Sequence, residues 1–71
     1  MINIEKGQIW LVQIGTIGER VCEIANDDFH GHIVVANLKD GIMNYPSKDN
    51  LRKYLGESLE DAKLKNSAYF I

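Results

Sequence analysis

The chain has 71 residues, with eight basic and ten acidic side chains, and its formal net charge is −2. Its apolar share of 45% and its charged share of 25% are ordinary for a globular protein and exclude a disordered chain. The charge lacks the basic excess typical of duplex-DNA binders, the lone Cys22 excludes an internal disulfide, and no apolar run is long enough to span a membrane. We therefore expect a single cytoplasmic domain over residues 1–71, with no membrane partner.

The first two-thirds of the chain predicts four short strands separated by turn signals. Residues 8–14 (QIWLVQI) are rich in β-branched and aromatic types and are mostly apolar on both alternating faces, so we expect this strand to be central or inside a barrel. A polar cluster at residues 26–31 predicts a turn, and Asp40 followed by Gly41 predicts a tight one. The predicted strands span residues 8–14, 20–26, 32–38 and 42–45.

The pattern changes to a helical period after the fourth strand. Apolar spacings of three and four within residues 51–55 predict a short helix that Ser47 caps and Gly56 ends. Ser58 and Asp61 predict the start of a second helical turn.

The final segment SAYFI, residues 67–71, is apolar and aromatic and predicts a closing strand. Four strands, a short helix and a further strand, joined by tight turns, are in the order of an SH3-like small barrel. Closure of the barrel would also remove the exposed edges of a sheet built from such apolar strands. We therefore predict a mostly β fold, an SH3-like small barrel of about five strands with a short helix near the C-terminus.

Several segments resemble known small barrels. Residues 6–12 (KGQIWLV) look like the opening of SH3-like barrels of the KOW and Tudor kind, in which a Lys-Gly turn precedes a strand with a buried aromatic residue. The same run followed by GTIGERVCEIAND at 15–27, IVVANL at 33–38 and LRKYLGESLED at 51–61 is similar to the MazF/PemK toxin family, whose members are themselves SH3-like barrels.

Members of the MazF/PemK family cleave RNA, so the resemblance implies a catalytic role for Arg20, which lies where the family has its arginine. The chain departs from the family pattern at two places. Val21 follows the arginine where members usually carry proline, and Lys39 and Asp40 stand where a threonine or serine is expected. The chain is also shorter than a typical member. An endoribonuclease is therefore an alternative prediction.

Other chemical signals in the chain are weak. One cluster contains the side-chain types that zinc prefers, but its spacing matches no established ligand signature. Strand alternation also places its cysteine on the same face as Ile24, which is typical of a core thiol rather than a nucleophile. We therefore predict no catalytic residue, metal or cofactor. The cluster comprises Cys22, Asp27, Asp28, His30 and His32.

A small basic and aromatic group near residues 48–54 suggests a second alternative, a barrel that binds single-stranded RNA. Aromatic rings beside basic groups stack on bases in many small barrels. The net charge of −2 disfavours a nucleic-acid partner. The group comprises Lys48, Arg52, Lys53 and Tyr54.

The prediction that these observations favour is a non-enzymatic module that acts by protein–protein contact. Its size suits a regulator or inhibitor of the kind that phages and mobile elements use against a host or defence protein. Pairing of an edge strand would stabilise a barrel this small, so we also expect a homodimer. The predicted partner surface comprises Trp10, Phe29, His30, Tyr45, Arg52, Lys53 and Tyr54.

Overall fold

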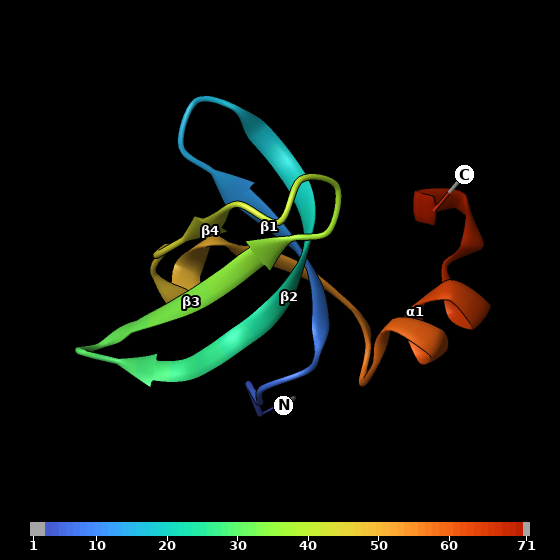
Figure 1. Ribbon diagram of the computed structural model, residues 1–71, viewed down its shortest axis with the longest axis horizontal. Helices are drawn as coiled ribbons and strands as arrows, with labels where there is room; N and C mark the ends of the chain where they lie inside the picture. The colour runs from blue at the N-terminus through green and yellow to red at the C-terminus, as the bar shows by residue number, and fades with distance from the viewer. Residues whose placement is uncertain (1–2, 71) are drawn as a thin grey trace.

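A computed structural model describes residues 3–70, which form five antiparallel strands, one α-helix and two short 3-10 helices (Figure 1). The predicted fold class is confirmed, because the chain is mostly β and carries a short helix after its fifth strand. In chain order the elements are β1 (Ile9–Ile14), β2 (Gly18–Phe29), β3 (His32–Asn37), β4 (Met43–Asn44), η1 (Lys48–Asn50), β5 (Leu51–Gly56), α1 (Leu59–Lys65) and η2 (Ser67–Phe70).

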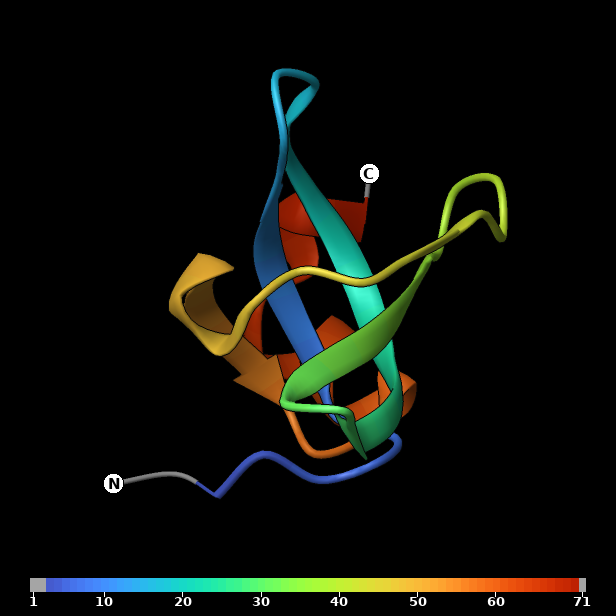
Figure 2. The same ribbon diagram turned by 90° about the vertical axis from the view of Figure 1, so that its left-hand side faces the viewer.

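The five strands form one sheet in the order β4-β3-β2-β1-β5. Consecutive strands pair from β1 to β4, and β5 then returns to pair with the free edge of β1. The segment that contains β4 crosses β1 and β2 on the side opposite α1 (Figure 2). The sheet therefore curls around its inner face, as the predicted barrel order requires.

The first of two cores lies inside this curve, and we call it the barrel core. Its members come from alternate positions of β1, β2 and β3, so each strand directs one of its faces inward. Trp10 and Leu51 pack against its margin. The buried members are Val12, Ile14, Cys22, Ile24, Ile33 and Val35.

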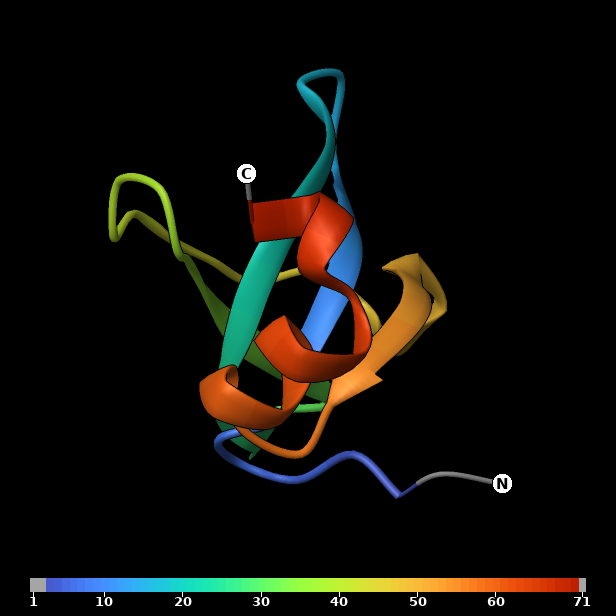
Figure 3. The same ribbon diagram turned by 90° about the vertical axis from the view of Figure 1, so that its right-hand side faces the viewer.

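The second core lies on the opposite face of the sheet, and we call it the helix-side core. The segment comprising α1 and η2 lies in front of β1 and β2 in Figure 3 and covers this face. β1 contributes to both cores, which confirms the prediction that its strand is central. The buried members are Ile9, Leu55 and Ala62, with Leu11, Val21, Leu38 and Phe70 packed against them.

The β2–β3 hairpin is longer than the sequence indicates. We predicted that the strand ends at residue 26 and that residues 26–31 form a turn, whereas β2 continues to Phe29 and pairs there with His32. Only His30 and Gly31 form the turn, with φ values of 52° and 83°. Positive φ at both central residues matches the twist of paired strands, so the ladder extends almost to the tip. Histidine is among the residue types that tolerate this conformation.

The helix predicted between Ser47 and Gly56 is wrong over residues 51–55. These residues form β5, and only the single turn η1 follows Ser47. Two register shifts between β1 and β5 allow Leu51 to reach the barrel core while Leu55 reaches the helix-side core. The apolar residues whose spacing suggested a helix therefore pack on opposite faces of a bulged strand. Pairing with β1 therefore stabilises residues 51–55 as a strand more than their local helical propensity stabilises a helix.

Gly56 has a different role from the helix end that we predicted. It is the last residue of β5, and α1 packs directly over it. A Cβ atom added at this position would lie 2.5 Å from the backbone nitrogen of Ala62 and 2.8 Å from its Cα. Glycine is required here because the backbone of the helix approaches too closely for any side chain.

The start of α1 is confirmed as predicted. The Oγ of Ser58 accepts a hydrogen bond from the backbone nitrogen of Asp61 at 3.1 Å. The Asp61 carboxylate in turn accepts from the backbone nitrogen of Glu57 at 3.0 Å and pairs with Lys65 at 3.1 Å. These hydrogen bonds, with the backbone one the strongest, lower the pKa of Asp61. The helix is thus fixed at its first turn, above the helix-side core.

The closing strand predicted over residues 67–71 is wrong for the residues that the structure describes. Ser67–Phe70 form η2, and Ile71 lies outside the described residues. Both edges of β1 are already paired, so Phe70 is covered by packing on the helix-side core rather than by strand pairing. Within residues 3–70, the helices are too short or too polar to cross a membrane.

Candidate partner-binding surface

Three of the predicted surface residues gather at the tip of the β2–β3 hairpin, and we call them the hairpin cluster: Phe29, His30 and Tyr45. The ring centroids of Phe29 and His30 are 4.8 Å apart in an edge-to-face arrangement, and those of Phe29 and Tyr45 are 6.0 Å apart. Phe29 is 46% exposed and Tyr45 is 60% exposed. The rings support one another, yet much of their surface still faces solvent.

The residues next to the hairpin cluster along the chain include one exposed apolar side chain and two exposed acids. Met43 on β4 is exposed, and it lies two positions before Tyr45 on the same strand segment. Asp27 and Asp28 directly precede Phe29 on β2, and both are exposed. A surface of exposed rings with an acidic border has the composition of a protein contact.

Trp10 and Tyr54 form a separate pair, away from this cluster. They are opposite each other on β1 and β5, with ring centroids 5.3 Å apart in an edge-to-face geometry. The indole Nε1 of Trp10 donates to Gln8 Oε1 at 3.0 Å. Gln8 is itself buried, and its Nε2 donates to the carbonyl oxygen of Asn3 at 2.7 Å. This pair therefore closes the margin of the barrel core and anchors the preceding segment, a role for Gln8 that the sequence did not suggest.

Arg52 and Lys53, which we predicted at the rim of the partner surface, lie on β5 and make different contacts. Lys53 is opposite Leu11 in the ladder, and its Nζ lies 5.5 Å from the centroid of the Tyr69 ring. Arg52 falls at a register shift, and its Nη1 donates to the carbonyl oxygen of Asp49 at 3.4 Å. The predicted surface is therefore divided, because β5 carries these two cations beside different neighbours.

The weak metal cluster is not assembled in the structure. Cys22 is buried in the barrel core, whereas His30 and His32 lie at the exposed hairpin tip. Across residues 3–70, no group of three or more potential ligand side chains is close enough to hold a metal ion.

The thiol of Cys22 is held in its protonated form. Burial raises its pKa from 9.0 to about 11, and the negative charge of Asp40 adds to this effect while Arg20 opposes it. The Sγ donates a long hydrogen bond of 3.6 Å to the carbonyl oxygen of Arg20. A buried thiol with a raised pKa is the opposite of an activated nucleophile.

This raised pKa makes the stability of the protein depend on pH above 9. The unfolded thiol loses its proton near pH 9.0, whereas the folded thiol keeps it until about pH 11. The folded state therefore binds more protons in this interval, and the free energy of unfolding should fall by about 2 kcal/mol as the pH rises. Urea unfolding at pH 8 and pH 10.5 measures the fall. Cys22→Ala should lack about this amount of the fall in the free energy of unfolding. An equal fall in the variant and in the original protein would show that the Cys22 thiol is not its source.

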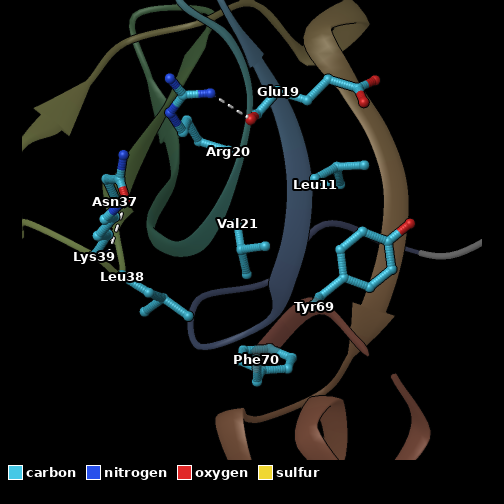
Figure 4. Close-up of a pocket in the computed structure, with 9 residues that line it drawn as sticks. All are labelled: Leu11, Glu19, Arg20, Val21, Asn37, Leu38, Lys39, Tyr69 and Phe70. Carbon is cyan, nitrogen blue, oxygen red and sulfur yellow. Dashed lines mark hydrogen bonds between the residues drawn. The ribbon is translucent and has the colours of Figure 1, made fainter. Parts of the chain in front are cut away.

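Arg20 lines a pocket of about 690 Å³ between the sheet and η2, shown in Figure 4. Its Nη1 donates to the carbonyl oxygen of Glu19 at 2.8 Å. His30 lies at the other end of β2, so the structure does not place this imidazole beside Arg20 as an acid or base. The remaining lining residues are Leu11, Val21, Asn37, Leu38, Lys39, Tyr69 and Phe70.

No protein-family model matches the chain, and comparisons with curated proteins and with solved structures found no similar protein. The resemblances to KOW, Tudor and MazF/PemK proteins therefore stay predictions.

Proposed function

We propose that this protein is a non-enzymatic binding module that docks on another protein through its hairpin cluster. The observation that carries the proposal is the gathering of Phe29, His30 and Tyr45 at one exposed tip. Aromatic side chains supply large contact areas at low conformational cost and dominate many protein interfaces. A role as a regulator or inhibitor, such as a phage protein that blocks a host factor, fits a small module of this kind.

The charge around the hairpin cluster favours a protein partner over RNA. Asp27 and Asp28 directly precede Phe29 on β2 and are both exposed, so their charges disfavour phosphate groups near the hairpin tip. A protein surface with an apolar centre and basic residues at its edge would complement both features. The partner that we propose therefore presents lysine or arginine side chains around an apolar depression.

Truncation of two exposed rings should abolish partner binding without unfolding the protein. Phe29→Ala with Tyr45→Ala removes side chains that are about half exposed and pack mainly on each other, so the free energy of unfolding should fall by only about 1 to 2 kcal/mol. Loss of two interface aromatics should weaken binding at least a hundredfold. Affinity capture from cells that make the protein, followed by calorimetry with the retained partner, measures both effects.

Leu64→Ala is the matched control, because Leu64 is 85% exposed and lies on α1, away from the hairpin cluster. It should retain the partner at full strength. Retention of the same partner by the double variant would contradict the proposal, as would loss of the partner in the control alone.

A further inference from the structure

We propose that the pocket beside η2 binds an organic anion with an apolar body, such as an aryl-acetate. This site is separate from the hairpin cluster and does not depend on the function proposed above. The pocket is an open groove of about 690 Å³, a volume comparable with that of small-molecule sites.

The floor of the pocket is apolar and belongs to the helix-side core. Leu11 and Val21 come from neighbouring positions of β1 and β2, and Leu38 and Phe70 border them. Figure 4 shows these side chains grouped around one space. An aromatic or aliphatic body placed on them would lose water from both surfaces.

The rim of the pocket carries cations that have no carboxylate partner. Within residues 3–70, the ion pair between Asp61 and Lys65 is the only salt bridge, so neither Arg20 nor Lys39 is neutralised by direct contact. The hydrogen bond from Arg20 Nη1 to a main-chain carbonyl fixes the guanidinium at the rim and leaves its other N–H groups for a ligand. A carboxylate matches the paired N–H groups of an arginine side chain.

Two cations, Arg20 and Lys39, and one acid, Glu19, line the pocket, so its lining has a formal charge of +1. Lys53 lies over the ring of Tyr69, which is itself part of the pocket wall. Glu19 also lines the pocket, but its carboxylate extends away from the Arg20 guanidinium in Figure 4. An anion with an apolar body therefore complements both the rim and the floor, whereas inorganic phosphate would leave the floor uncovered.

Titration of ¹⁵N-labelled protein with naphthalene-1-acetate tests the site, and neutral naphthalene-1-acetamide is the matched probe without charge. We expect saturable shifts at the amides of Leu11, Val21 and Leu38, and affinity for the acetate at least tenfold above that for the acetamide. Arg20→Gln should weaken acetate binding about tenfold and leave acetamide binding unchanged. Lys63→Gln, on the exposed part of α1, should change neither.

Equal affinity for the two probes would overturn the proposal, as would shifts confined to other residues or no saturable shift up to about 10 mM. A hexauridylate titration covers the nucleic-acid alternative. Strongly salt-dependent binding of hexauridylate at these amides, without binding of the acetate, would assign the pocket to RNA and would also overturn the proposal. The amide spectra of the variants show whether each remains folded.

Discussion

Gly56→Ala should destabilise the protein by about 3 kcal/mol, the upper part of the range for an overpacked site. The new Cβ would lie 2.5 Å from the backbone nitrogen of Ala62, and a backbone atom cannot rotate away as a side chain can. Relief therefore requires α1 to move off β5, which exposes Leu55 and the rest of the helix-side core. Urea unfolding followed by circular dichroism measures the loss, and amide spectra would show the displaced helix.

Gly41→Ala is the control for this prediction. Gly41 has φ of +74°, so alanine there is strained, but no atom lies within 4 Å of the added Cβ. We expect a cost of about 1 kcal/mol from the backbone alone. A loss at Gly56 no greater than that at Gly41 would show that the helix does not pack on β5 as described.

Ile24→Ala should cost about 3 to 4 kcal/mol, which is most of the stability expected for a domain of this size. Ile24 is completely buried in the barrel core, and the sheet around it is paired on both sides of β2. The rigid ladder cannot collapse into the cavity that the substitution leaves, so both the transfer energy and the packing energy are lost.

Ile17→Ala makes the same chemical change at an exposed position. Ile17 is 63% exposed in the turn between β1 and β2, and we expect a cost below about 0.5 kcal/mol. Chemical denaturation of both variants under one set of conditions gives the comparison. Similar losses at the two positions would place Ile24 outside the core.

Part of this fold follows from local sequence. The strand at residues 8–14 is apolar on both faces, and the structure uses both, one toward each core. Ser58 and Asp61 have the spacing of a helix start, and their side chains make the expected capping hydrogen bonds. These features depend on neighbours a few residues away, and local patterns record them well.

Other parts depend on contacts that are distant along the chain. Residues 51–55 have helical spacing, but they pair with residues of β1 that lie 39 to 44 positions earlier, from Val12↔Leu51 to Trp10↔Tyr54. The extension of β2 to Phe29 depends on a two-residue turn in which His30 and Gly31 both have positive φ. Asn-Gly is the usual sequence signal for such a turn, whereas His-Gly is not. The pocket has a related cause: η2, rather than the strand predicted over residues 67–71, brings Tyr69 to the same pocket as Arg20.

The candidate surface was predicted only in part. Phe29, His30 and Tyr45 come together because the hairpin tip and the end of β4 meet. Trp10 and Tyr54 were chosen for their aromatic character, but their register opposite one another places them at the margin of the barrel core. Residue type alone does not tell an exposed ring from one that covers a core.

Site-specific photo-crosslinking tests the proposed function most directly. A photoreactive benzoylphenylalanine at position 45, inside the hairpin cluster, should form a covalent adduct with the partner when cells that make the protein are irradiated. The same group at position 64, exposed on α1, should not. A specific adduct from position 45 alone is the result that we predict. Adducts from position 64 alone, or equally from both positions, would contradict docking through the hairpin cluster.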